Sequence, residues 1–145
     1  MKAIRHFEEF LRENTVKKQK PDISRAEFLI LESGRSYSLL IKKIRLLGIS
    51  EETANDLVKS CYDIIMESLR AEMLLKGYNA SGHGAHEAEV SYMRLLGFNE
   101  TEVQFADQLR FFRNGMLYYG ASLDEEYAEK VIEFTKKTCL KLKKR

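Results

Sequence analysis

The sequence lacks the features that mark disulfide-rich, secreted and membrane proteins. Its 145 residues include no tryptophan, one proline and two cysteines, Cys61 and Cys139. Two cysteines exclude a disulfide framework and an all-cysteine zinc site. No apolar run approaches the roughly 18 residues that a membrane-spanning helix needs, and Glu8 and Glu9 stand where a signal peptide would carry apolar residues. We therefore expect a soluble, cytoplasmic protein with reduced thiols.

No charge of one sign dominates the chain either. The 24 lysines and arginines nearly balance the 22 aspartates and glutamates, which leaves a net charge of +2. No global field therefore directs the protein to nucleic acid or to a membrane. What is present is a globular composition, 44% hydrophobic and 32% charged, which excludes a disordered chain. The length fits one domain with a sizeable core, or one domain with a short appendage.

The residues that begin and end helices dominate the pattern, and no segment of six or more residues alternates between apolar and polar. Capping signals stand at Ser24, Ser50, Asn99 and Ser122. Gly48 is a suitable left-handed stop for the helix that precedes it. These signals predict five or six helices, over residues 2–16, 24–47, 51–76, 85–96, 99–113 and 123–142.

The connections between these helices are short, which favours antiparallel neighbours. The predicted fold class is therefore all-α, with the helices in an up-and-down bundle. The stretch 17–22 is the only linker-like segment, and Pro21 disfavours helix at the residue before it. We therefore divide the chain into an N-terminal helical appendage, residues 1–20, and a helical bundle, residues 21–145. The clearest loop is the segment 77–84, which contains three glycines.

Metal and cofactor chemistry is weakly indicated. His83 and His86 have the spacing at which two imidazoles on one helix face can share a metal ion. A third ligand is not indicated by spacing, and His83 lies in the glycine-rich loop. We therefore predict no metal site and no cofactor. The basic C-terminal segment, residues 136–145, either contacts phosphates or forms a solvated helix end, where cations favour the helix dipole.

The most informative segment surrounds Arg113. On one helix, Ala106, Leu109, Arg113 and Met116 follow the spacing i, i+3, i+7, i+10. This spacing places Arg113 on the apolar stripe, where an arginine is costly unless it is paired or faces a ligand or a partner. Asn114 adds a hydrogen-bonding amide beside it.

Two further groups accompany this arginine. Tyr118 and Tyr119 supply phenols and aromatic faces for stacking. Glu67 falls near the buried side of its helix, either as a paired core carboxylate or as a site residue. Two interpretations of Arg113 therefore remain open: it is satisfied by a carboxylate such as Glu67 or Glu72, or it faces a ligand or a partner.

With these residues in place, the sequence resembles the HEPN family (higher eukaryotes and prokaryotes nucleotide-binding domain). The hallmark of that family is an arginine, a polar residue and, after about four intervening residues, a histidine. Arg113 and Asn114 match the pair, and Tyr118 stands where the family has histidine. Residues 61–77 resemble the family's long second helix, and 81–84 the loop into its third. The resemblance covers roughly residues 25–141.

The resemblance implies an antiparallel four-helix bundle that forms a homodimer, here with an extra N-terminal helix. Catalytic members cut RNA without metal, through the arginine and histidine of two subunits that meet at the dimer interface. Many members pair with a small nucleotidyltransferase in toxin–antitoxin modules. Tyr118 departs from the pattern in chemistry, because a phenol titrates near pH 10 and is a poor general base at pH 7.

We therefore expect a HEPN-like dimer that binds RNA, a nucleotide or a nucleotidyltransferase partner, without efficient catalysis. The binding residues expected from the sequence are Arg113, Asn114, Tyr118, Tyr119, His83 and Glu67. One alternative is a metal-independent endoribonuclease whose catalytic residues are Arg113 with Tyr118 or a loop histidine. The other alternative is a structural or protein-interaction bundle.

Overall fold

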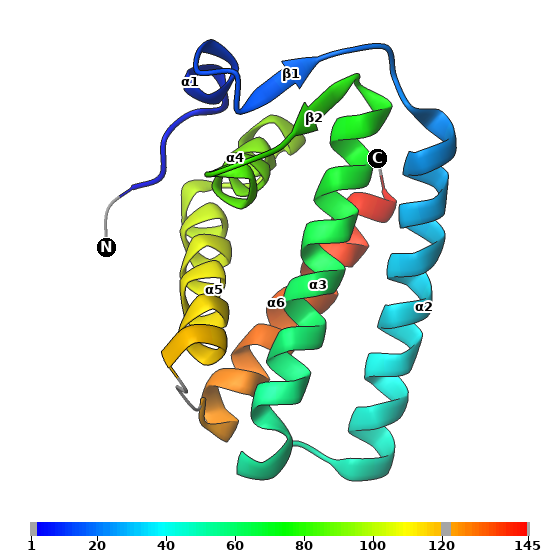
Figure 1. The fold of residues 1–145 in the computed structure, drawn as a ribbon. Coiled ribbons are helices and arrows are strands. Elements are labelled where there is room, and N and C mark those ends of the chain that lie inside the picture. The colour runs from blue at the N-terminus through cyan, green and yellow to red at the C-terminus, as the bar shows by residue number, and fades with distance from the viewer. Residues whose placement is uncertain (1–2, 120–122, 145) are drawn as a thin grey trace.

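The computed structural model describes residues 3–119 and 123–144, and over these ranges the chain is mostly helical, as predicted (Figure 1). Its α-helices are α1 (Phe7–Arg12), α2 (Ile23–Leu47), α3 (Glu51–Leu75), α4 (Ala85–Ser91), α5 (Glu100–Tyr119) and α6 (Glu125–Lys143). A 3-10 helix, η1 (Tyr92–Leu96), follows α4, and the strands β1 (Val16–Lys18) and β2 (Tyr78–Ala80) form a small antiparallel sheet. None of the described helices combines the length and the apolar character needed to cross a bilayer.

Two helices begin where capping signals predict them. The Ser50 hydroxyl accepts a hydrogen bond from the Thr53 amide, and the Ser50 amide donates to the Thr53 hydroxyl, 3.1 Å away. Asn99 and Glu102 form the same reciprocal box at the start of α5, with both side-chain-to-amide distances at 2.9 Å. Each box satisfies amides that a helix start otherwise leaves unpaired.

Two other helix starts, and one helix end, differ from the prediction. Asp22 caps α2 in place of Ser24, and Asp124 caps α6, whereas Ser122 lies outside the described residues. An aspartate caps as well as a serine does and adds a negative charge at the positive helix end, which explains why it takes the cap. Helix α5 continues past Arg113 to Tyr119, because a single glycine such as Gly115 costs a helix only about 1 kcal/mol.

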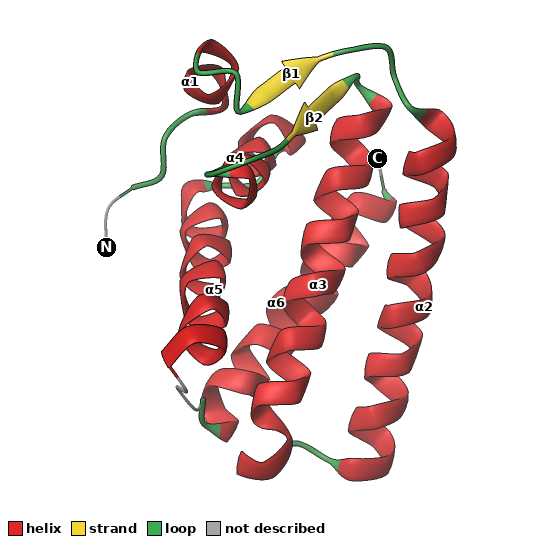
Figure 2. Ribbon diagram, in the orientation of Figure 1, coloured by secondary structure: helices red, strands yellow, loops and turns green. Residues whose placement is uncertain are grey.

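The N-terminal segment forms less helix than predicted and gains a strand. Residues 2–16 were expected to be helical, but α1 has six residues, and Val16–Lys18 pairs with Tyr78–Ala80 beside one end of the long helices (Figure 2). The Gln19 amide also donates to the Gly77 carbonyl, 2.7 Å away. Gly77 has φ +82°, and a Cβ there would collide with the Gln19 carbonyl oxygen, so this close approach requires glycine. Pairing between such distant segments leaves no signal in local periodicity.

Helix α3 lies at the centre of the molecule, between α2 and α5, with α6 packed against it (Figure 1). The core is continuous from α3 into α4, α5 and α6, and it includes Phe7, Phe10 and Val16 of the N-terminal segment. Helix α2 packs against α3 and buries only Ala26 and Leu40. The fold therefore has one side where α3, α4 and α5 converge and another side that consists of α2 alone.

Candidate functional site

A cleft of about 370 Å³ lies where α3, α4 and α5 converge, and we refer to it as the Arg113 cleft. Most of the side chains that line it are polar or charged. Helix α3 contributes five residues, α4 one and α5 two: Tyr62, Asp63, Met66, Glu67, Arg70, His86, Arg113 and Asn114. The cleft therefore combines donors, carboxylates and an imidazole at the junction of three helices.

Two guanidinium nitrogens of Arg113 have no hydrogen-bond partner among the residues that the structure describes. Its Nε and Nη1 atoms are buried and form no hydrogen bond within the described part of the chain, and the same holds for Oε2 of Glu67. The two side chains line one cleft but form no ion pair within 4 Å, and neither does Arg113 with Glu72. The structure therefore does not contain the ion pair between Arg113 and Glu67 or Glu72 that one interpretation of the sequence requires. Buried donors without partners are rare in folded proteins and call for a ligand, a water or a partner.

A second arginine in the cleft is fully paired. Nε of Arg70 lies 2.7 Å from Oε2 of Glu89, and Nη2 lies 3.2 Å from Oε1. Nδ1 of His86 lies 3.1 Å from the same Oε1. Burial alone would raise the pKa of Glu89, which is only 2% exposed, but the hydrogen bonds from His86 and Arg70 outweigh it and lower that pKa. Glu89 is therefore a buried, ionised carboxylate that holds two cationic or donor groups in place.

This network also orients the imidazole. A carboxylate accepts hydrogen bonds, so the contact with Glu89 assigns the proton of His86 to Nδ1. Nε2 is then free to accept a proton from another group. The imidazole side chain is 59% exposed and lies edge-on to the Tyr62 ring, with the ring centroids 6.4 Å apart. His86 is thus an oriented, accessible imidazole at the rim of the Arg113 cleft.

Two other ionisable groups in the cleft, Tyr62 and Glu67, have raised pKa values. Burial raises the pKa of Tyr62 to about 12; the charges of Arg110 and Arg113 oppose this shift, and those of Glu89 and Asp63 add to it. Tyr62 is therefore a hydrogen-bond donor at neutral pH. Burial, followed by the negative charges of Asp63 and Glu32, raises the pKa of Glu67, while Arg70 opposes this shift.

The structure brings together three of the residues expected to bind ligand: Arg113, Asn114 and Glu67. His83 is not among the lining residues; it is exposed in the turn before α4, and His86 occupies the cleft instead. Tyr118 and Tyr119 belong to the last turn of α5, but their side chains lie outside the described part of the structure. No position relative to the cleft is therefore assigned to either phenol.

Five residues that line the cleft or hold its side chains in place were not predicted from the sequence: Tyr62, Asp63, Met66, Arg70 and Glu89. A signal for four of them was present. The pairs 62/66, 63/67 and 66/70 are four residues apart, and 67 and 70 are three apart, which places these positions on neighbouring parts of one helix face. The contact between Arg70 and Glu89 joins two helices, and no local spacing indicates it.

The structure does not support a reactive thiol or a metal site among the described residues. Burial raises the pKa of Cys61 and of Cys139 to about 11, which keeps both thiols protonated and unreactive. Within residues 3–119 and 123–144, no group of three or more histidine, cysteine, aspartate or glutamate side chains is placed to hold a metal ion. The Arg113 cleft is therefore the best candidate site in the part of the chain that can be described.

No family model matches the chain, and no curated protein or solved structure shows significant similarity to it. What the cleft can bind therefore follows from its own side chains. Arg113 presents unused donors in the geometry that matches a phosphate or carboxylate. Asn114 and Tyr62 add neutral hydrogen-bonding groups, and Asp63 and Glu67 add acceptors for hydroxyl groups.

Proposed function

We propose that the protein is a HEPN-like cytoplasmic dimer whose Arg113 cleft binds RNA or a nucleotide without efficient catalysis. In this proposal α2, α3, α5 and α6 form the antiparallel four-helix bundle, and α1 with β1 is the N-terminal addition. The observation that carries it is Arg113, whose Nε and Nη1 are buried in the cleft without partners in the described chain. Such a guanidinium binds one phosphate group well.

The charges around Arg113 favour a nucleotide over a bare anion. Arg70 is neutralised by Glu89, so Arg113 is the one cleft arginine left to neutralise a phosphate. Asp63 and Glu67 repel additional negative charge but accept hydrogen bonds from ribose hydroxyls. RNA carries a 2′-hydroxyl that DNA lacks, so acceptors at this point favour RNA or a ribonucleotide. A nucleotidyltransferase partner of a toxin–antitoxin module would present its anionic groups to the same arginine.

Binding of a fluorescent single-stranded RNA and of ribonucleotides tests this proposal. We expect Arg113→Gln to weaken binding at least tenfold, because it removes the charge that neutralises the phosphate. Arg12→Gln, which makes the same charge change at an exposed position of α1, should change the affinity less than about twofold. Equal affinities of the two variants, or no binding by the parent protein, would contradict the proposal.

A second candidate function is metal-independent cleavage of RNA, and the orientation of His86 favours it. With Nδ1 bonded to Glu89, Nε2 can take the proton of a ribose 2′-hydroxyl. The 2′-oxygen then attacks the phosphorus as the bond from phosphorus to the 5′-oxygen breaks, and the 5′-oxygen takes a proton from solvent water. A 2′,3′-cyclic phosphate and a 5′-hydroxyl remain, and His86 returns its proton to the solvent. Arg113 would stabilise the charge that develops on the phosphoryl oxygens.

A cleavage assay in EDTA separates the two candidates. Cleavage of mixed single-stranded RNA that is lost in Arg113→Gln and in His86→Asn supports the ribonuclease and assigns the base. Cleavage that survives His86→Asn but is lost in Tyr118→Phe would assign the base to Tyr118. If the parent protein binds RNA and leaves it intact, binding without catalysis remains the function.

A further inference from the structure

The Arg113 cleft contains unpartnered buried atoms of two opposite kinds. Nε and Nη1 of Arg113 are donors, Oε2 of Glu67 is an acceptor, and none of the three has a hydrogen-bond partner among the described residues. A phosphate group satisfies the guanidinium nitrogens but leaves the carboxylate oxygen without a partner. A ligand that satisfies the whole cleft must therefore also present hydrogen-bond donors to Glu67.

The two carboxylates of the cleft differ in their exposure to solvent. Asp63 is exposed, whereas Glu67, one turn later on α3, is partly buried and its Oε2 is shielded from water. Asp63 therefore suits a ribose hydroxyl at the rim of the cleft. Glu67 suits the base, which is the part of a nucleotide that leaves water when it stacks in a site.

We propose that the Arg113 cleft selects guanine among the four bases of RNA, through the carboxylate of Glu67. The Watson–Crick edge of guanine carries two adjacent donors, N1–H and the N2 amine, and one carboxylate can accept from both through its two oxygens. Adenine and cytosine place an acceptor beside their single amine donor, and uracil places a carbonyl oxygen on each side of N3–H, so all three bring an acceptor against a carboxylate. This inference rests on the proposed function, because a base is selected only if the cleft binds a nucleotide.

The other side chains of the cleft complete the match. Guanine O6 is an acceptor beside N1–H, and the Tyr62 hydroxyl and the Asn114 amide are donors in the same cleft. Burial raises the pKa of Tyr62 to about 12, so its hydroxyl stays protonated at neutral pH. The rings of Tyr62 and His86 supply faces on which a base can stack. The volume of about 370 Å³ lies near the lower end of the range for small-molecule sites, which suits one nucleotide.

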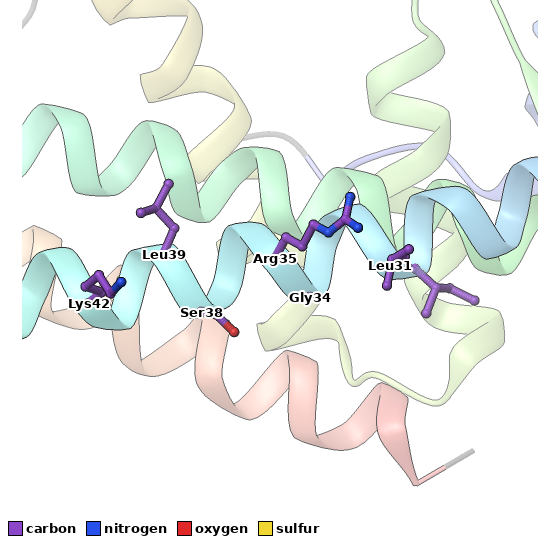
Figure 3. A pocket seen from close by; sticks show the side chains of 7 residues that line it. Leu31, Gly34, Arg35, Ser38, Leu39 and Lys42 are labelled. Atoms are coloured by element: carbon purple, nitrogen blue, oxygen red, sulfur yellow. The ribbon is translucent and has the colours of Figure 1, made fainter.

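The groove along α2 lacks these features. It has a volume of about 560 Å³ and lies between residues 30 and 42 (Figure 3). Arg35 and Lys42 line it and can attract a phosphate, but none of its lining residues is a carboxylate. Base selection through a carboxylate is therefore expected in the Arg113 cleft and not in this groove, which makes Lys42 a control position.

The test is isothermal titration calorimetry at pH 7 with the 5′-monophosphates of guanosine, inosine, adenosine, cytidine and uridine. These ligands share the phosphate and the ribose and differ in the base alone. Guanosine monophosphate should bind at least tenfold more tightly than the other three RNA nucleotides, because those leave Glu67 without its donors. Inosine retains O6 and N1–H but lacks the amine, so its affinity should lie between those of guanosine and adenosine.

The decisive variant is Glu67→Gln, which has nearly the same shape. Glutamine offers one acceptor and one donor, the pattern that pairs with adenine. The ratio of the guanosine to the adenosine affinity should fall at least tenfold, while both ligands still bind through Arg113. The ratio is the readout, because removal of a negative charge raises the affinity of every anionic ligand.

Glu72→Gln, on the same helix outside the cleft, and Lys42→Gln, in the α2 groove, should each keep that ratio within about twofold of the parent value. Circular dichroism checks that each variant is folded.

Equal affinities of the parent protein for the five nucleotides, or a ratio that Glu67→Gln leaves unchanged, would overturn the selection of guanine. If those equal affinities are lost in Arg113→Gln, nucleotide binding itself stands without base selection. If no monophosphate binds, the selection of guanine is overturned, and the RNA-binding measurement described above decides whether the proposed function fails with it.

Discussion

Helices α2 and α3 have the same length, 25 residues, and follow each other along the chain, yet they have opposite surroundings. Twelve residues of α3 are buried, against two of α2. Both helices carry enough apolar residues for a buried stripe, so composition does not explain the difference. The neighbours explain it, because α3 is packed against α2, α4, α5 and α6, whereas α2 is packed against α3. The position of a helix within the fold therefore depends on its neighbours, and many apolar residues of α2 stay exposed in the described chain.

The polar groups of the two regions differ in the same way. On the α3 side Glu89 is buried and Arg70 is partly buried, and a change of charge at either residue alters the hydrogen-bonded network Arg70–Glu89–His86. On α2, Glu27 and Lys42 are exposed and form no ion pair within the described residues, so single changes there should have little effect on folding. Substitutions of buried residues and of exposed residues in these two helices should therefore differ by several kcal/mol in their effect on the free energy of unfolding. The predictions below test this contrast.

The largest effect should come from Arg70→Met. It leaves Glu89 as a buried carboxylate with only His86 as a partner, and the loss of one member of a buried pair costs about 3–5 kcal/mol. The measurement is the free energy of unfolding in urea at one fixed protein concentration.

The double variant Arg70→Met/Glu89→Leu is the control for this prediction. Replacing both partners by apolar residues of similar size should recover most of the lost stability, because no unpaired charge remains. If the double variant is as unstable as the single one, the loss arises from packing and not from the buried charge.

The next effect compares two neighbouring leucines on α2. Leu40 is fully buried against α3, and Leu39 is 55% exposed. Leu40→Ala should cost about 2–5 kcal/mol through the lost burial and the cavity, whereas Leu39→Ala should change the folding of the single chain by less than about 0.5 kcal/mol. Urea unfolding at low protein concentration measures both. Equal losses would show that the exposed face of α2 is covered within the chain itself.

The helices and the arginine could be predicted from the sequence because their signals are local. The boxes at Ser50 and Asn99, the stop at Gly48 and the apolar stripe around Arg113 all lie within a few residues of the features that they indicate. The pairing of β1 with β2 and the contact of Arg70 with Glu89 join segments that are distant in sequence, so no periodicity reports them. The exposure of α2 was not predictable either, because an amphipathic pattern does not say which molecule covers the apolar side.

The choice between His83 and His86 shows the same limit within one loop. Both histidines lie near the start of α4, and spacing alone made either of them a candidate for the cleft. Glu89 distinguishes the two histidines, because it lies one turn after His86 on α4 and bonds to its imidazole. Arg70 of α3 holds Glu89 in place through two hydrogen bonds. One partner of this network is local and the other is not, and only the folded chain combines them.

The smallest effect, and the one that concerns the cleft alone, should come from Glu67→Gln. Because the pKa of Glu67 is raised in the folded state, chiefly by burial, the folded protein holds that proton more tightly than the unfolded chain does. The stability contributed by this group therefore falls as the pH rises from about 4 towards neutrality. Glutamine carries no charge at any pH, so the variant should be more stable than the parent at pH 7, by less than about 1 kcal/mol for a half-exposed group, and equal to it near pH 4.

Urea unfolding between pH 4 and 7 measures this difference, with Glu72→Gln as the matched control on the same helix outside the cleft. A gain that grows with pH for Glu67→Gln alone would show that the cleft holds an uncompensated carboxylate in the absence of ligand. If Glu72→Gln follows the same profile, the effect belongs to the overall charge of α3 and not to the cleft. If Glu67→Gln destabilises the protein at pH 7, the ionised carboxylate must have a cationic partner in solution. Arg113, which lines the same cleft and has two nitrogens without partners in the described chain, is the candidate.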